Sequence, residues 1–220
     1  MSNRATIVDD RLFAYLKDNF SSEDEFLAEL QIKAKEAGLP PISISPEQGK
    51  FMQFLLHSVN AKHVLEIGTL GAYSAITMAR ALPDDGKIIT VENEPKHYEF
   101  ACKMVLESGL ANKIEVVLAD GKNFVKEYRT QNQFDFVFVD ADKPSYLYYL
   151  NNITPKIKIG GIFAADNAFA FGFILDSKPE RNPDDVKSIR SFNEYFRTRD
   201  NYFTCIVPVG DGIIMGYKKY

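Results

Sequence analysis

Two apolar runs in this sequence end in oxygen-bearing side chains that could bind a metal ion. Asp140 follows the run 134–139, and Asp166 and Asn167 follow the run 157–165. If the two runs are neighbouring strands of a parallel sheet, these side chains lie about 5 Å apart at one sheet edge. A donor set of oxygens without His or Cys favours a hard cation such as Mg²⁺, Mn²⁺ or Ca²⁺. The alternative is that each acid only caps the turn or helix that follows its strand.

Lys143 comes three residues after Asp140 and is a candidate proton acceptor beside this cation. A lysine removes a proton only as a neutral amine. A nearby cation favours the neutral form, whereas Asp140 and Asp142 oppose it. Taken together, the two acids and the lysine favour a reactive site over separate caps.

A second candidate site is the strand, glycine turn and helix expected in residues 63–74. Gly68 and Gly71 let a ligand approach the backbone, and the following helix offers free N–H groups to an anionic group. Glu92, at the end of the next expected strand, is placed to accept both hydroxyls of a ribose. The pattern favours a nucleoside-containing cofactor, with a plain tight turn as the alternative. The Gly-x-x-Gly spacing does not match the dinucleotide fingerprint, which argues against an NAD oxidoreductase.

Short apolar runs that alternate with helical stretches must position these residues. The sequence predicts an α/β fold with a doubly wound, mostly parallel sheet. We expect parallel strands at 63–67, 88–91, 114–118, 134–139 and 157–165, and an antiparallel C-terminal hairpin from 202–208 and 212–218. We expect helices at 9–20, 22–37, 46–59 and 186–199, the second opened by a capping box from Ser22 to Glu25. Residues 1–220 are predicted to form a single domain, with 1–38 as an N-terminal helical appendage.

The composition is that of an ordinary globular protein. The chain has 220 residues, of which 45% are hydrophobic and 25% charged, and a formal net charge of −4. This balance gives no general attraction to nucleic acid or anionic lipid. Because no apolar run reaches the roughly 20 residues that span a bilayer and the start lacks the apolar core of a secretion signal, we expect a soluble, cytoplasmic protein without membrane contact. Cys102 and Cys205 are predicted to be buried thiols.

Several motifs resemble those of the cation-dependent O-methyltransferases of the caffeoyl-CoA and catechol type. They are VLEIGTLGAYSAITMA, VENEP, VLADG, FVDADKPSYLYYL, GGIFAADN and PVGDGIIMGYKK. The resemblance runs from about Pro46 to the C-terminus and is most specific in the DADK and DN pairs. It implies the seven-stranded, Rossmann-like fold of class I S-adenosylmethionine methyltransferases and a homodimer. It also implies S-adenosylmethionine and a divalent cation (Mg²⁺, or else Mn²⁺ or Ca²⁺) as cofactors, and a catechol or caffeoyl-type phenol with adjacent hydroxyls as the acceptor.

The resemblance also implies roles for individual residues. Asp140, Asp166 and Asn167 would bind the metal, and Lys143 would be the general base, with Asp140 beside it in the catalytic set. The cofactor would be bound by Ile44, Glu66, Gly68, Thr69, Ser74, Glu92, Ala119, Asp140 and Asp142.

Two other functions stay open at this point. One is methylation of a hydroxylated uridine in tRNA, which a cluster of basic residues could support: Lys178, Arg181, Lys187, Arg190, Arg197 and Arg199. The other is a non-catalytic nucleoside-binding module. Residues 1–20 and 168–185, which form the acceptor pocket in this family, show no pattern that identifies the acceptor.

Overall fold

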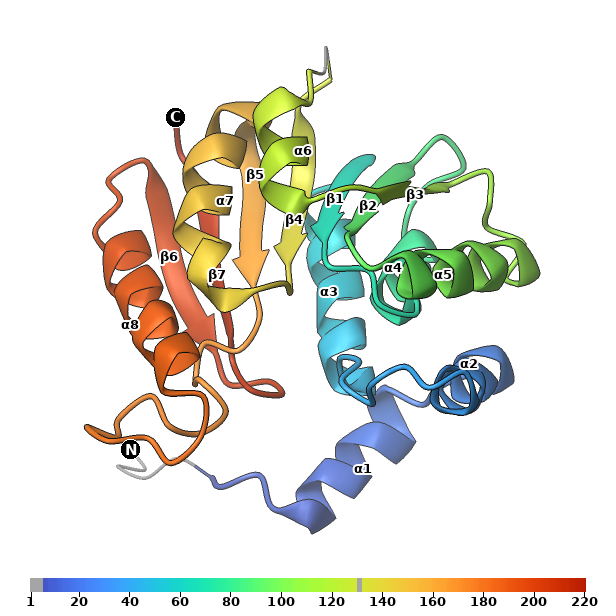
Figure 1. Ribbon diagram of the computed structural model, residues 1–220, viewed down its shortest axis with the longest axis horizontal. Helices are drawn as coiled ribbons and strands as arrows, with labels where there is room; N and C mark the ends of the chain where they lie inside the picture. The colour runs from blue at the N-terminus through green and yellow to red at the C-terminus, as the bar shows by residue number, and fades with distance from the viewer. Residues whose placement is uncertain (1–5, 130–131) are drawn as a thin grey trace.

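The computed structural model describes residues 6–129 and 132–220 and shows a seven-stranded sheet between two layers of helices (Figure 1). The strand order is β3-β2-β1-β4-β5-β7-β6. The strands are β1 (His63–Ile67), β2 (Lys87–Glu92), β3 (Ile114–Leu118), β4 (Phe134–Val139), β5 (Ile157–Ala165), β6 (Tyr202–Val207) and β7 (Ile213–Lys218). Strands β1 to β5 pair in parallel, and β7 is antiparallel to both β5 and β6. The predicted doubly wound sheet with a C-terminal hairpin is confirmed.

Helices cover both faces of the sheet. They are α1 (Asp10–Phe20), α2 (Glu25–Glu36), α3 (Pro46–Ser58), α4 (Tyr73–Ala79), α5 (Pro95–Glu107), α6 (Gly121–Glu127), α7 (Tyr146–Ile153) and α8 (Pro183–Arg197), with short 3-10 helices η1 (Lys143–Ser145) and η2 (Thr154–Lys156). None of the helices within the described residues is long and apolar enough to cross a membrane.

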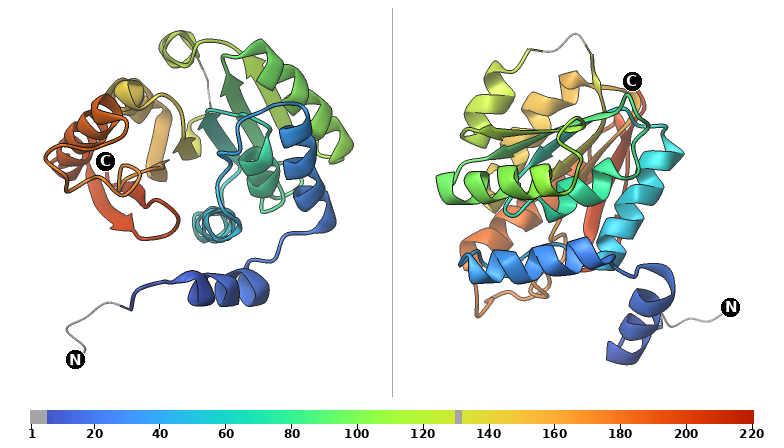
Figure 2. Two further views of the ribbon diagram at one scale, coloured as in Figure 1. Left: turned by 60° about the horizontal axis from the view of Figure 1, so that its bottom comes forward. Right: turned by 90° about the vertical axis from the view of Figure 1, so that its right-hand side faces the viewer.

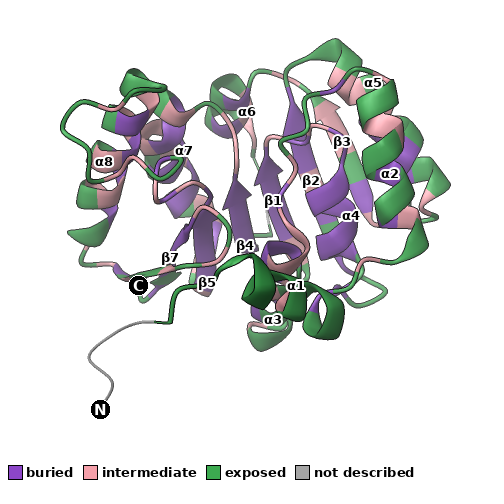
Figure 3. Cartoon of the chain, turned by 90° about the horizontal axis from the view of Figure 1, so that it is seen from below, coloured by how far each residue is buried: buried purple, intermediate pink, exposed green. Residues whose placement is uncertain are grey.

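The alternation of side chains along each strand divides the core between the two faces. Val64 of β1 packs in the cluster that contains residues of α3, α4 and α5, whereas Leu65 packs in the cluster with α6, α7 and α8. Because successive side chains of a strand point to opposite faces, one strand contributes to both clusters. The central strands are therefore buried almost throughout (Figure 3), as expected for a parallel sheet with helices on both faces.

The first two helices lie on the side of the molecule toward which β4 and β5 point (Figures 1 and 2). Leu27 and Leu30 of α2 are buried in the cluster shared with α3 to α5, while α1 buries none of its residues. The predicted capping box from Ser22 to Glu25 is wrong. The N-cap is Asp24, whose carboxylate accepts the Leu27 N–H at 2.9 Å, so the helix begins later than expected. Residues 1–5 of the predicted appendage lie outside the described residues.

The C-terminal hairpin ends the sheet with β6. Only Tyr202 of this strand is buried, because β6 has a neighbouring strand on one side alone. Cys205 is consequently exposed and Cys102 is only partly buried, so the prediction of two buried thiols is wrong.

Candidate active site

A cavity of about 470 Å³ lies at the carboxyl ends of the parallel strands, where a doubly wound sheet binds its ligands. Its size suits a nucleoside-sized molecule. Every predicted site residue except Glu66 lines it: Ile44, Gly68, Thr69, Ser74, Glu92, Ala119, Asp140, Asp142, Lys143, Asp166 and Asn167. The structure therefore brings the two candidate sites of the sequence into one cavity.

The glycine turn after β1 passes close to the end of β4. Gly68 has φ +98°, and a Cβ at this position would overlap the backbone oxygen of Asp140. The Glu92 carboxylate holds this turn, because its Oε2 accepts the N–H groups of Thr69 at 3.2 Å and Leu70 at 2.8 Å. Ribose hydroxyls bound at Glu92 would share its oxygens with these backbone donors. The sequence did not reveal that Glu92 also holds the glycine turn.

Glu66 lies in β1, two residues before Gly68, and is fully buried without lining the cavity. Its Oε2 accepts a hydrogen bond from the Thr90 hydroxyl at 2.6 Å. Among the described residues its Oε1 makes no well-formed hydrogen bond, although the Ser74 hydroxyl lies near enough to lower the pKa of the carboxyl. Burial raises the pKa of Glu66 to about 7. A buried carboxylate oxygen without a donor is costly, and a cationic group would satisfy it. This observation fits the ammonium group of a bound S-adenosylmethionine.

Asp140 and Asp166 extend two neighbouring strands. Val139 pairs with Ala165 in the register of β4 and β5, and the Asp166 N–H donates to the Val139 oxygen at 3.1 Å. Burial, and then the charge of Asp140, raise the pKa of Asp166 to about 7. Two acids that repel each other in a poorly solvated place are stabilised by a cation between them.

The donors at this position fit a hard cation. Within residues 6–129 and 132–220, no group of three or more His, Cys, Asp and Glu side chains is arranged to hold a metal ion by itself. The Asp140 and Asp166 carboxylates and the Asn167 amide would form the protein's share of the site. A Mg²⁺ ion bound by few protein ligands keeps its other positions for water or for oxygens of a substrate.

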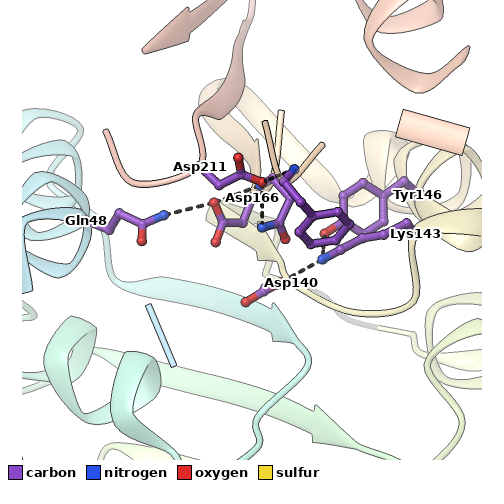
Figure 4. A network of polar contacts seen from close by, with 8 residues as sticks. Gln48, Asp140, Lys143, Tyr146, Asp166 and Asp211 are labelled. Atoms are coloured by element: carbon purple, nitrogen blue, oxygen red, sulfur yellow. Dashed lines mark hydrogen bonds and ion pairs between the residues drawn. The ribbon is translucent and has the colours of Figure 1, made fainter. Parts of the chain in front are cut away.

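Lys143 begins η1 and points toward the same acids (Figure 4). Its Nζ donates to Asp140 Oδ1 at 2.9 Å and to the Tyr146 hydroxyl at 2.8 Å. Tyr146 is only 1% exposed, so it supports the lysine from inside the core. The amine is therefore held beside Asp140, one of the oxygen ligands of the proposed cation, where it could reach a hydroxyl bound to that cation.

The cavity is also lined by residues that the sequence analysis missed. The Tyr149 hydroxyl donates to Asp142 Oδ1 at 2.8 Å and lies against Gly121. His97 also lines the cavity, with its Nδ1 3.7 Å from Glu92 Oε1. The signal for His97 was its place in the first turn of the helix after β2, where ligands of this fold class bind.

Comparisons with known proteins agree with this geometry. The model of the O-methyltransferase family matches residues 17–219. A catechol O-methyltransferase from Niastella koreensis is 37% identical over 181 residues, which cover 81% of each chain. A caffeoyl-CoA O-methyltransferase from Populus kitakamiensis is 29% identical over 212 residues, covering 92% of this chain and 90% of the relative.

Solved structures show the same fold. The O-methyltransferase from Bacillus cereus in complex with SAH superimposes with a TM-score of 0.86 at 30% identity, covering 94% of this chain and 96% of the other. TomG from Streptomyces achromogenes, solved in complex with SAM, has a TM-score of 0.84 at 29% identity and covers 94% and 95% of the two chains. Together with the cavity, these likenesses show that the chain belongs to the O-methyltransferase family and is an S-adenosylmethionine-dependent O-methyltransferase of the caffeoyl-CoA and catechol type.

Proposed function

We propose that this enzyme depends on a divalent cation and methylates one of two adjacent hydroxyls of a small phenolic acceptor, of the catechol or caffeoyl type. The observation that carries the proposal is the placing of Asp140, Asp166 and Asn167 beside Lys143 in the cavity that contains the glycine turn. These residues would hold Mg²⁺, or else Mn²⁺ or Ca²⁺.

Each part of the cavity has a defined task in this reaction. A bound cation supplies Lewis acidity that lowers the pKa of a hydroxyl next to it. Lys143 Nζ, as a neutral amine, accepts the hydroxyl proton. Bound S-adenosylmethionine would supply the methyl group and leave as S-adenosylhomocysteine. The buried Glu66 would pair with the cofactor's ammonium group and so help to orient the methyl donor.

A low-water cavity favours this chemistry. The acceptor oxygen is negative and the sulfonium is positive, so charge is neutralised along the reaction. Bulk water would stabilise the separated charges before the reaction, whereas a dry site stabilises them less and so lowers the barrier. Phe171 lines the same cavity and offers an aromatic surface on which a phenol ring could stack.

The test is a methyl-transfer assay on catechols, phenolic thioesters and tRNA, run with Mg²⁺ and with a chelator. We expect turnover of a catechol-type acceptor that stops in chelator, and loss of this turnover in Asp166→Ala with SAH binding retained. Full activity in chelator would contradict the cation requirement. Turnover of tRNA alone would contradict the acceptor class.

The structure offers little support for the tRNA alternative. Arg190 donates to backbone carbonyls in the segment 173–176, and Arg197 forms an ion pair with Glu194. These members of the basic cluster are engaged with the protein itself, which leaves fewer cations for a phosphate backbone. Steeply salt-dependent tRNA binding would favour the alternative nonetheless.

The remaining expectations have their own tests. A non-catalytic module would bind SAH but transfer no methyl group to any diphenol. The proposed homodimer would sediment at twice the mass of the chain.

A further inference from the structure

Gln48 contacts the proposed cation site although it lies far from it in the sequence. Its Nε2 donates to Asp166 Oδ1 at 2.9 Å, and the side chain is only 4% exposed (Figure 4). Gln48 is the third residue of α3 and forms a capping box with Ser45, the N-cap. Its Oε1 accepts the Ser45 N–H at 3.0 Å and the Ser45 hydroxyl at 3.1 Å.

These contacts settle which way the Gln48 amide points. Two donors of Ser45 hold the amide oxygen, so the NH₂ group must face the other way, toward Asp166. The backbone of the β6–β7 hairpin closes over the amide, because a Cβ at Gly210 would overlap the Gln48 side chain. The amide is therefore an oriented donor in a closed space.

This donor selects one oxygen of the Asp166 carboxylate. Asp166 Oδ1 accepts from Gln48 Nε2 and also from the Asn167 N–H at 2.8 Å. Among the residues that the structure describes, both hydrogen bonds to this carboxylate end on Oδ1. Oδ2 is the oxygen left for a cation.

Asp211, at the tip of the β6–β7 hairpin, orients the neighbouring amide in the same way. Its Oδ2 accepts Asn167 Nδ2 at 3.1 Å and the Phe171 N–H at 2.7 Å. Since an ionised carboxylate cannot donate, the NH₂ group of Asn167 must face Asp211, and Oδ1 of Asn167 points away from it. Asn167 has φ +62°, a backbone conformation that Asn adopts more readily than most residues.

We propose that Gln48 and Asp211 are positioning residues that present Asp166 Oδ2 and Asn167 Oδ1 to the cation. The proposal rests on the proposed cation dependence of the enzyme. Neither residue touches the reacting atoms. The ligands Asp166 and Asn167 follow the end of β5. Gln48 of α3 fixes Asp166, and Asp211 of the β6–β7 hairpin fixes Asn167. Groups that hold metal ligands in this way typically change metal affinity by about 10–100-fold when removed.

The test compares Mn²⁺ binding to the full-length enzyme and its variants, measured by the EPR signal of free Mn²⁺. Gln48→Met removes the donor to Asp166 at similar length, and Asp211→Asn lets the Asn167 amide turn over. We expect each to weaken Mn²⁺ binding by about 10-fold or more. SAH affinity, measured by calorimetry in chelator, should stay at the wild-type value.

Gln53→Met is the matched control. Gln53 lies on the same helix and donates to the Thr77 backbone oxygen at 2.8 Å, away from the acids. We expect its Mn²⁺ affinity to equal that of the wild type. Wild-type Mn²⁺ affinity in both Gln48→Met and Asp211→Asn, or an equal loss in Gln53→Met, would overturn the inference. Absence of Mn²⁺ binding to the wild-type enzyme would instead contradict the proposed function.

Discussion

At the scale of single residues, we predict that the protonation of Glu66 controls how strongly the enzyme binds the ammonium group of its cofactor. Burial raises its pKa from 4.5 to about 7, so the carboxyl is largely neutral in weakly acidic solution. Only the ionised form pairs with the ammonium of the cofactor. We therefore expect SAH affinity, measured by calorimetry, to rise as the pH increases through about 7. Glu66→Gln should bind SAH about 10-fold or more weakly and without this pH dependence. A pH-independent affinity of the wild type would contradict the assignment.

The raised pKa of Glu66 also predicts that the stability of the ligand-free protein falls as the pH rises, whereas the SAH affinity increases. Because the pKa of Glu66 is higher in the folded protein than the ordinary 4.5, its contribution to the free energy of unfolding is complete below pH 4.5 and is lost as the pH rises to about 7. Urea unfolding of the ligand-free enzyme should show this loss, and the loss should be smaller in Glu66→Gln, where Asp166, whose pKa is also raised to about 7, still titrates. If the free energy of unfolding of Glu66→Gln depended on pH as that of the wild type does, Glu66 would not titrate in this range.

Lys143 is the second residue whose chemistry can be isolated. Lys143→Ala should lower the rate of methyl transfer by about 10² or more if the amine accepts the proton. Lys143→Arg is the matched variant, because a guanidinium keeps the positive charge but cannot give up its proton at working pH. The pH–rate profile distinguishes the roles. A profile unchanged in Lys143→Ala, or full activity in Lys143→Arg, would remove Lys143 as the base.

The residues of the proposed cation site show what sequence reasoning can and cannot reach. Asp140 and Asp166 follow buried strands directly, and parallel strands end at one edge, so their meeting could be predicted. The contact of Gln48 with Asp166 depends on how α3 packs against the end of β5, which no local pattern encodes. The capping box of Ser45 and Gln48 was not predicted, and such a box indicates only where a helix begins.

At the scale of elements, the glycine turn after β1 is shaped by its neighbours as much as by its own residues. Glu92 at the end of β2 holds the turn from one side, and the end of β4 limits it from the other. Gly68→Ala should abolish SAH binding and lower the melting temperature, because it combines a positive φ with an overlap at Asp140.

Gly109 provides the control for this substitution. It also has a positive φ, +72°, but a Cβ there would meet nothing within 4 Å. Gly109→Ala should therefore cost only about 1–2 kcal/mol of backbone strain and leave SAH binding intact. Calorimetry with SAH and thermal melting distinguish the two variants. SAH binding by Gly68→Ala at wild-type strength would contradict the close approach of the turn to β4.

The sequence predicted the strands more accurately than the helix starts. The runs 134–139 and 157–165 coincide with β4 and β5 because these largely buried strands are nearly all apolar and are followed directly by Asp140 and Asp166. The run 114–118 coincides with the edge strand β3, whose residues are mostly not buried. The start of α2 was wrong because Ser22 and Asp24 can both cap a helix, and the local pattern does not choose between them.

At the scale of the whole molecule, the strand order explains why chemistry gathers at one place. Strand β1 lies between β2 and β4, and β4 lies beside β5, so the ends of these strands bring the glycine turn, Glu92 and both acids into one cavity. The antiparallel β7 then returns the chain, and the hairpin places Asp211 over Asn167. The alternating pattern predicted the class of fold, whereas the contact between hairpin and β5 required the packed structure.

The most direct test is a crystal structure of the enzyme with Mg²⁺, SAH and a catechol. We predict one cation bound by Asp140, Asp166 and Asn167, with both catechol oxygens on the cation and Lys143 Nζ within hydrogen-bonding distance of one of them. A cation bound elsewhere, or a catechol held at the SAH sulfur with these three side chains turned away from each other, would contradict it.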